Sequence, residues 1–565
     1  MSLGLALGPA EAAVRAALDG LDRSGFPARL WRRDPTLWGD DPARQRVAQN
    51  RLGWLTVPAR MNAEADSLGA FGEEIARRGF TRAVLLGMGG SSLAPEVLRL
   101  TFGVRPGALD LAVLDNTSPA AVRAASAGYD PARTLVLVSS KSGGTVEVSS
   151  FEKVFDAAAR AAAGDAAGGS FIAITDPGTS LAALAGGRGY QRAFLNPPDI
   201  GGRYSALSYF GLVPAALIGA DLDALLDGAL EEAHTLEGAR AAADCPGITL
   251  GAALGALARA GRDKVTLALD VRLAALASWI EQLLAESTGK DGAGLIPIAD
   301  EPLGAPDVYG ADRVFVAVSA GPPDAEAAAA LERLERAGHP VLRWSRAELD
   351  ELGAEFMRWE IATATAGVEL GVDPFNEPNV AEAKEATRVT LERFVAERRF
   401  PPQPPAEPGG LARLLGDAKP GDYVAILAWM ERTPERHARL SRLRSAIRDR
   451  SRLATTLGYG PRYLHSTGQL HKAGPPTGVF VQVTADHDAD VAIPGLPYGF
   501  ATLERAQALA DAEALASRHR RLLHVHLGTA VDAGLKAMVA AVTEKPARAR
   551  RPLGRRNPPR RRAAR

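Results

Sequence analysis

The chain has 565 residues, which is too long for one hydrophobic core, since single cores stop growing at roughly 250–300 residues. Hydrophobic residues make up 46% of it and charged residues 23%, as in ordinary soluble globular proteins. No apolar run reaches the roughly 20 residues that a membrane span needs. The single cysteine, Cys245, excludes an intrachain disulfide and a cysteine-based zinc site. We therefore expect at least two domains and a reducing, cytoplasmic setting.

The two ends of the chain differ in charge. The first 20 residues lack a basic leader and carry Glu11, so they predict an amphipathic helix and not a secretory signal. The stretch from Lys545 holds one Lys, nine Arg and no acid, and without these ten cations 56 basic residues face 66 acidic ones, a net charge of −10. We predict a disordered, solvated tail; a nucleic-acid role is disfavoured because a basic stretch alone gives only nonspecific phosphate attraction.

Short apolar runs alternate with Ala/Leu-rich helical patterns, which predicts an α/β fold with parallel sheets and crossover helices. The first doubly wound sheet is expected to take its strands from residues 81–88, 109–116, 133–140 and 170–176, with helices at 93–102 and 146–163. A second α/β unit is expected from strands at 264–270, 312–321 and 340–345 and a helix at 271–287.

Proline marks the next boundary, because the segment PPQPPAEPGG cannot hold a helix or an inner strand. Beyond it lies a region of mixed content, with one strand expected at 478–484 and one helix at 501–519. The predicted divisions are a helical lead (1–60), a first α/β domain (61–235), a second (236–400), a linker (401–410), a mixed C-terminal region (411–544) and the basic tail (545–565).

Two turns of the first sheet carry candidate anion-binding residues, because ligands of open α/β sheets bind beyond the carboxyl ends of strands. Gly87–Ser92 places glycines and hydroxyls before a helix, although it lacks the third glycine of the dinucleotide fingerprint. Ser139–Thr145 stacks hydroxyls, a lysine and two glycines on one turn. Either turn alone could be a tight connection with capping hydroxyls. Two such turns in one sheet together indicate a phosphate site.

These turns resemble the sugar-isomerase (SIS) domain signatures of the phosphoglucose isomerase family, and further family blocks follow at Gly201, Trp279, Gly371 and Tyr463. The resemblance extends from about residue 29 to about residue 527 and is greatest to the isomerase part of bifunctional transaldolase/phosphoglucose isomerase chains. It implies two doubly wound parallel-sheet SIS domains plus the mixed C-terminal region. A transaldolase barrel is not expected within these residues, since it would need roughly 200 residues of its own.

The resemblance also implies an activity, the metal-independent and cofactor-free interconversion of glucose 6-phosphate and fructose 6-phosphate in glycolysis and gluconeogenesis. Glu286 matches the family's general base, Arg203 the arginine that faces the enediolate, and Gln282 a glutamine that contacts substrate. The phosphate site of the family falls on Gly90, Ser91, Ser140, Lys141, Ser142 and Thr145. A homodimer is expected from the family.

Ring opening is assigned by the resemblance to Lys384 together with a histidine. The block around Lys384 departs from the family at Asn376 and Glu377, where Asp and Gln are usual, which puts one substrate hydrogen bond in doubt. The histidine block follows Lys384 in the chain, whereas in single-function isomerases it precedes the lysine. Because geometry and not chain order makes a site, a relocated segment can still complete it.

Two histidines, His465 and His471, compete for this role, and either could instead be a packed histidine. We favour His465, because Tyr463 and Leu464 before it suggest a strand end, while Lys472, Gly474 and Pro475 after His471 suggest an exposed turn.

Two other functions fit the phosphate turns. One is an isomerase of another phosphosugar, which the set of Glu286, Lys384 and His465 disfavours. The other is a sugar-phosphate sensor without turnover, for which no helix-turn-helix is evident ahead of the first sheet.

Overall fold

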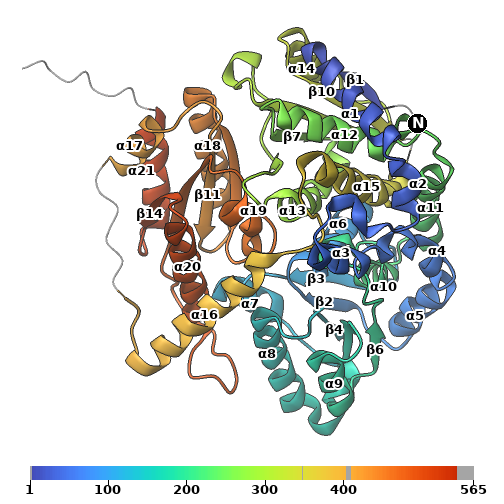
Figure 1. Cartoon of the computed structure of the whole chain (residues 1–565). Coiled ribbons are helices and arrows are strands. Elements are labelled where there is room, and N and C mark those ends of the chain that lie inside the picture. Colours follow the sequence, from blue (N-terminus) through green and yellow to red (C-terminus); the bar gives the residue numbers. More distant parts are fainter. Residues whose placement is uncertain (1–2, 347, 402–408, 544–565) are drawn as a thin grey trace, which may run out of the picture.

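Three sheets organise the chain (Figure 1). The structure is a computed structural model that describes residues 3–346, 348–401 and 409–543. The basic tail from residue 545 and most of the proline-rich segment lie outside the described residues, and so do the predictions made for them.

The first sheet is parallel throughout, in the order β3-β2-β4-β5-β6. Every residue of β4 and β5 is buried, as in a sheet covered by helices on both faces. The strands are β2 (Arg82–Leu86), β3 (Asp110–Leu114), β4 (Thr134–Ser139), β5 (Phe171–Thr175) and β6 (Arg192–Leu195). The helices are α5 (Ala65–Arg77), α6 (Leu93–Phe102), α7 (Pro119–Ser126), α8 (Val146–Ala163), α9 (Ser180–Gly187), α10 (Tyr209–Ile218) and α11 (Leu222–Gly238).

The second sheet has the order β1-β10-β9-β7-β8 and is parallel except at the edge strand β1. Its strands are β1 (Gly4–Ala6), β7 (Lys264–Leu269), β8 (Ile296–Ile298), β9 (Arg313–Ala320) and β10 (Val341–Arg346). Its helices are α12 (Pro246–Arg259), α13 (Leu276–Thr288), α14 (Ala325–Arg336) and α15 (Leu352–Leu370). The α/β class and the paired parallel sheets predicted from the sequence are confirmed.

The N-terminal residues differ from the continuous helix predicted for them. Gly4–Ala6 form β1, which pairs antiparallel with β10, and the helix begins only at Glu11. The helices that follow are α1 (Glu11–Arg23), α2 (Phe26–Trp31), α3 (Pro42–Gln49) and α4 (Val57–Asn62). Because the pairing of β1 with β10 is a long-range contact, the short apolar run ahead of the helix did not indicate a strand.

The third sheet, within the region predicted as mixed, is parallel in the order β12-β11-β13-β14. Its strands are β11 (Tyr423–Trp429), β12 (Ala454–Tyr459), β13 (Gly478–Thr484) and β14 (Arg521–His526). Its helices are α17 (Gly410–Gly416), α18 (Pro434–Ser451), α19 (Gly468–Ala473), α20 (Phe500–Ser517) and α21 (Val531–Thr543), and α16 (Pro378–Glu397) leads into it. Only β13 and α20 were predicted, so this region is more regular than expected.

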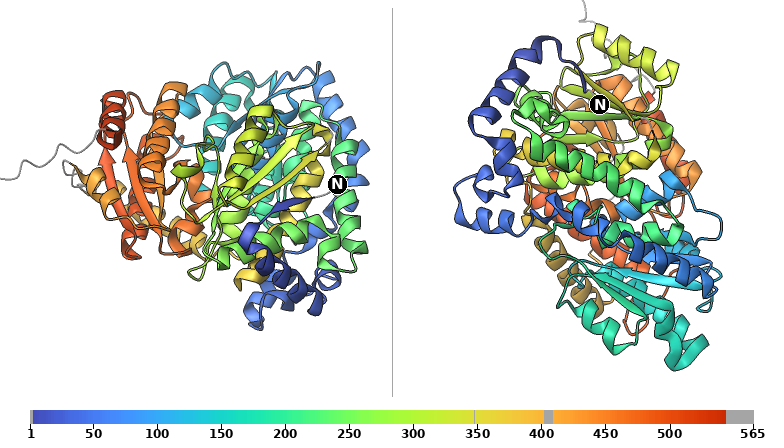
Figure 2. Two further views of the ribbon diagram at one scale, coloured as in Figure 1. Left: turned by 90° about the horizontal axis from the view of Figure 1, so that it is seen from above. Right: turned by 90° about the vertical axis from the view of Figure 1, so that its right-hand side faces the viewer.

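The three units meet around α13. One hydrophobic core joins a face of the first sheet to the second sheet, and a separate cluster packs Ala285 of α13 against Tyr423 and Phe480 of the third sheet. Figure 1 places α13 and α19 between the sheets, and Figure 2 shows the third sheet at one end of the molecule when seen from above. Helix α13 therefore carries its side chains to a place that all three units can reach.

Candidate active site

Glu286 and Gln282 lie one helical turn apart on α13 and share a face, as the sequence predicts. The amide of Gln282 donates to Oε2 of Glu286 at 3.1 Å and to the carbonyl of His465 at 2.8 Å. Oε1 of Gln282 is buried and has no hydrogen-bond partner among the described residues. Because a buried amide oxygen is costly to leave unpaired, this atom is available for a ligand hydroxyl.

Arg203 comes from a 3₁₀ turn, η6 (Gly202–Tyr204), and is fully buried in the wall of the same site. Its Nε donates to Ser287 Oγ at 2.7 Å, and its Nη2 donates to the carbonyls of Pro374 at 2.7 Å and Asn376 at 3.1 Å. These bonds hold the guanidinium plane in one orientation.

The remaining terminal nitrogen of Arg203 lies between two carboxylates. Nη1 is 3.6 Å from Glu286 Oε1 and 3.1 Å from Glu377 Oε2. Glu377, where the resemblance led us to expect a glutamine, is thus in contact with the site. A fixed cation beside a carboxylate base can stabilise an oxyanion that forms on a ligand.

The pKa of Glu286 is raised above its ordinary value, chiefly because the carboxyl is buried. The charge of Arg203 opposes this shift and the charge of Glu377 adds to it. A carboxylate whose pKa is raised toward neutrality is a stronger base than an exposed one.

Sequence reasoning missed Lys290, which follows the E-S-x-G part of the Glu286 block. Its side chain is buried, and Nζ donates to the carbonyl of Asp373 at 2.7 Å and to Oδ1 of Asn376 at 2.8 Å. Burial and the neighbouring Arg203 lower the pKa of Lys290 to about 7. Arg203 and Lys290 thus both bond to the loop that ends at Glu377. The lysine next to the glycine of the block was the available signal in the sequence.

His465 reaches the site from the third sheet. It does not stand at a strand end, as its neighbours suggested, but ends a 3₁₀ turn, η11 (Arg462–His465), six residues after β12. Its Nε2 lies 2.9 Å from Oε1 of Glu147. Arg462 in the same turn forms ion pairs with Asp115, at 3.2 Å, and with Glu96 in the first domain. The ion pairs of Arg462 therefore attach the histidine block to the first domain, three residues before His465.

Glu147, the partner of His465, was also missed by sequence reasoning. It lies in the first turn of α8, two residues after Thr145, and it is buried. Gln507 of α20 donates to the same oxygen at 2.7 Å. Burial acts to raise the pKa of Glu147, but the charge and the hydrogen bond of His465 outweigh it and hold this pKa below its ordinary value.

His471 is not in an exposed turn, and that part of the sequence interpretation is wrong. It lies on α19, is 2% exposed and packs against the rings of Tyr423, Tyr463 and Phe480. Neither ring nitrogen has a hydrogen-bond partner among the described residues, and burial lowers its pKa to about 3. Lys472, which suggested exposure, is buried in an ion pair with Asp511 at 2.7 Å.

The glycine turn after β2 is the point where the Arg203 and His465 segments meet. A Cβ on Gly90 would lie 2.1 Å from the carbonyl oxygen of Gly202, and one on Gly89 would lie 2.8 Å from the carbonyl oxygen of His465. Ser91 is buried beside them and ends the 3₁₀ turn η4 (Gly89–Ser91). Close backbone approach therefore requires both glycines, whatever the turn binds.

The second predicted turn follows β4. Ser140 Oγ lies 3.2 Å from Thr145 Oγ1, Ser142 is exposed, and Gly143 has a φ of +67°. The ammonium group of Lys141 pairs with Asp176 after β5. Burial lowers the pKa of Lys141, while Asp176 opposes that shift. The hydroxyls, the cation and the start of α8 are thus gathered as an anion would require.

Lys384 lies on α16 and is exposed. Its charge helps to lower the pKa of Glu147. The structure thus gathers Glu286, Gln282, Arg203 and His465 by direct contacts. Lys384 joins them only through its charge.

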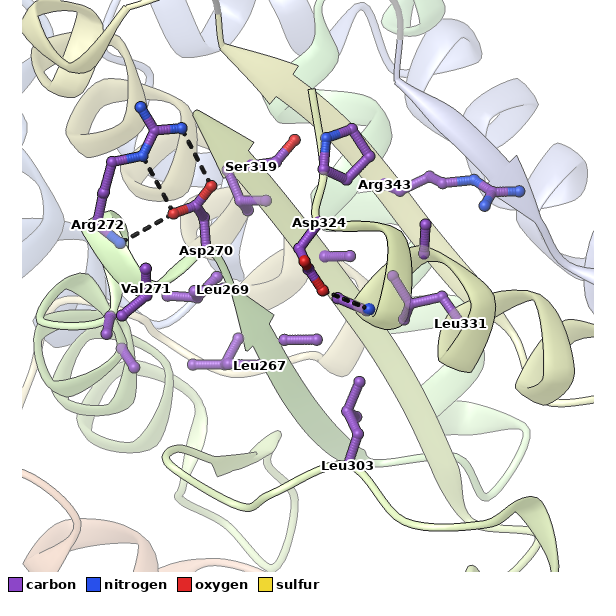
Figure 3. Close-up of a pocket in the computed structure, with 18 of the residues that line it drawn as sticks. Leu267, Leu269, Asp270, Val271, Arg272, Leu303, Ser319, Asp324, Leu331 and Arg343 are labelled. Atoms are coloured by element: carbon purple, nitrogen blue, oxygen red, sulfur yellow. Dashed lines mark hydrogen bonds and ion pairs between the residues drawn. The ribbon is translucent and has the colours of Figure 1, made fainter. Parts of the chain in front are cut away.

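A different cavity, of about 1150 Å³, lies at the carboxyl ends of β7 and β9 (Figure 3). Apolar side chains make up most of its wall, and Asp270 is paired with Arg272 at 3.3 Å. The carboxylate of Asp324 accepts hydrogen bonds from two backbone amides at the start of α14, both at 3.0 Å. The helix end that could face an anion is therefore already capped, and none of the predicted site residues lines this cavity.

The described residues also bear on two other classes of function. They contain no group of three or more His, Cys, Asp or Glu side chains arranged to hold a metal ion. None of the described helices combines the length and the apolar character of a membrane span.

The chain is similar in sequence to known proteins. The family model of phosphoglucose isomerase matches residues 61–294, which include Ser91, Lys141, Arg203 and Glu286. A probable glucose-6-phosphate isomerase of Haloarcula marismortui is 30% identical over 348 residues, 54% of this chain and 77% of that protein. The chain belongs to the phosphoglucose isomerase family. The sequence-based family prediction is thereby confirmed, and with it an enzyme of the aldose–ketose isomerase class.

Other members of the phosphoglucose isomerase family match over different lengths. The glucose-6-phosphate isomerase of Rubrobacter xylanophilus is 29% identical over 430 residues, 67% of this chain and 96% of that protein. A glucose-6-phosphate isomerase of Thermus thermophilus is 35% identical over 287 residues, 48% of this chain and 65% of that protein. The greater likeness to the bifunctional chains stays a prediction.

Solved structures agree at the level of the fold. A hypothetical protein of Thermus thermophilus superposes with a TM-score of 0.56 at 25% identity and covers 69% of this chain and 100% of that one. A glucose-6-phosphate isomerase of Chlamydia trachomatis superposes with a TM-score of 0.50 at 18% identity and covers 69% of this chain and 80% of that one.

Proposed function

We propose that the chain interconverts glucose 6-phosphate and fructose 6-phosphate, a step of glycolysis and gluconeogenesis. The observation that carries this proposal is the placement of Glu286 beside a buried, fully bonded Arg203. Moving a proton between neighbouring carbons needs one base and one group that stabilises the enediolate, and these two residues supply both.

The roles of the other residues follow from their positions. The phosphate group is held by Ser91 and by the turn with Ser140, Lys141, Ser142 and Thr145. Glu147 begins α8 just after that turn and contacts His465, which opens the sugar ring with Lys384. Gln282 offers its unpaired Oε1 to a substrate hydroxyl. The proposed enzyme acts as a homodimer in the cytoplasm and needs no metal or cofactor.

A coupled assay tests this proposal. Fructose 6-phosphate is supplied, and the glucose 6-phosphate formed is oxidised by an added dehydrogenase whose reduced nicotinamide is measured. Turnover is expected with fructose 6-phosphate and is expected to exceed that with other phosphorylated ketoses. Binding of fructose 6-phosphate without turnover would indicate a sensor, and faster turnover of another phosphoketose would assign a different substrate.

A further inference from the structure

Glu377 is one of the two residues at which the block around Lys384 departs from the family resemblance, and its side chain is the one that reaches Arg203. Glu377 is the residue before α16, where its side chain makes no capping hydrogen bond. That side chain is 37% exposed, whereas that of Arg203 is 2% exposed. Oε2 of Glu377 accepts from Nη1 of Arg203 at 3.1 Å. An ordinary glutamine oxygen could accept the same bond, but it would bring no charge.

The other donors of Arg203 are already used by Ser287 and by backbone carbonyls, so Nη1 alone faces the base. Nη1 is shared between Glu377 and Glu286, and it is nearer to Glu377. The carboxylate at position 377 therefore decides how much positive charge Arg203 presents beside Glu286.

The charged groups around this pair come from several elements. Glu286 lies among the charges of Arg203, Glu377 and Lys290. Glu377 lies among Arg203, Arg51 and Lys290, and its charge also acts on Lys141 of the phosphate turn. Asp373 adds a negative charge near Lys290. The charge of Glu377 thus acts on both the base and the lysine of the predicted phosphate turn.

We propose that Glu377 is a positioning residue that holds Arg203 beside Glu286 and makes the site discriminate against substrate analogues that carry a second anionic group. The proposal rests on the proposed function. It concerns the charge at position 377 and not the hydrogen bond alone.

The net charge of the site behaves differently during turnover and on binding of an anionic inhibitor. When Glu286 takes a proton from the sugar, one negative charge moves from the carboxylate to the enediolate, so the number of charges in the site stays the same. Glu377 should therefore change the rate of this step little. An aldonate instead brings an additional carboxylate while Glu286 keeps its charge, and like charges placed close together are costly. The charge of Glu377 should therefore weaken the binding of aldonates and leave the binding of alditols, which lack this carboxylate, unchanged.

Binding is measured for two probes, gluconate 6-phosphate and glucitol 6-phosphate, which differ by one carboxylate at carbon 1. In Glu377→Gln the dissociation constant of the aldonate should fall at least about fivefold relative to that of the alditol. Glu377→Asp keeps the charge and should keep the ratio of the natural chain. Glu385→Gln is the matched control, because Glu385 is an exposed carboxylate of the same helix that pairs with Arg388.

The pH profile of kcat/KM gives a second readout that a merely structural role would not move. The negative charge of Glu377 raises the pKa of Glu286, so its removal should move the acid limb of Glu377→Gln to lower pH. An unchanged ratio of dissociation constants, or an acid limb that stays in place or moves to higher pH, overturns the proposal. Absence of turnover in the natural chain would instead contradict the proposed function, and the binding ratio would still test Glu377.

Discussion

The Nε2 atom of His465 lies 2.9 Å from Oε1 of Glu147, although 318 residues separate the two in the chain. Glu147 belongs to the helix that follows the predicted phosphate turn, and His465 belongs to a turn after a strand of the third sheet. The contact therefore joins the phosphate end of the site to the proposed ring-opening group, and it requires the first and third units to be in place together.

The first prediction concerns this contact. Glu147→Gln keeps the shape of the side chain but removes the carboxylate that orients His465. A hydrogen bond to a charged group contributes about 1.5–3 kcal/mol, so turnover of the ring form should fall about ten- to a hundredfold. Turnover of an open-chain phosphosugar too short to form a six-membered ring should change little. Steady-state kinetics on both substrates checks this, and equal losses would show that Glu147 is structural.

The second prediction separates the two histidines. His465→Ala should slow the ring form far more than the short open-chain substrate, because proton transfer by Glu286 remains available. His471→Phe should leave the ratio of the two rates unchanged, since His471 only packs among aromatic rings. His471→Ala is expected to cost about 2–5 kcal/mol of stability through the cavity it leaves. A selective ring-opening defect in His471→Phe would reverse the assignment.

The third prediction follows from the pKa of His471, which burial lowers to about 3. Its ordinary value in the unfolded chain is about 6.5, so the unfolded state binds a proton that the folded state lacks between these two values. The free energy of unfolding is therefore highest above about pH 6.5, where His471 is neutral in both states. It falls as the pH drops toward 3, because protonation then favours the unfolded state. Relative to His471→Phe, the natural chain should lose about 2 kcal/mol between pH 7 and pH 5, as measured by denaturant unfolding. A constant difference across this range would contradict it.

The sequence predicted some strands and helices correctly and missed others. The apolar runs of β4, β13 and α8 predicted those elements because their local pattern and their burial agree. β14 was missed, because its sequence RLLHVH mixes charge and histidine with apolar residues and its burial is only partial. β1 was missed because its pairing with β10 is a long-range contact.

Some residues of the candidate site were likewise predicted from the sequence, and others were missed. Family motifs led to Glu286, Gln282 and Arg203, whose contacts lie within or between motif blocks. Glu147 was passed over even though it stands two residues from Thr145, since its role appears only when His465 arrives from the third sheet. The exposed setting inferred for His471 was wrong, because glycine and proline after a residue say nothing about burial of the residue itself.

The fourth prediction concerns the phosphate turn. Lys141→Ala with Ser142→Ala should raise KM for fructose 6-phosphate with little change in kcat, because contacts to the phosphate are similar in the ground and transition states. Arg160→Ala, which removes an exposed cation of α8, is a suitable control. A loss confined to kcat would mean that the turn does not hold the phosphate.

The most direct test of the account is the exchange of the carbon-bound proton with solvent. In Glu286→Gln, incorporation of deuterium from heavy water into fructose 6-phosphate and glucose 6-phosphate should fall by about 10²–10⁴-fold, since that is the usual effect of losing a general base. The dissociation constant of glucitol 6-phosphate should stay within about threefold of the natural chain, because Arg203 and the phosphate turn remain. Exchange near the natural rate in a folded Glu286→Gln protein would contradict the assignment of Glu286 as the base.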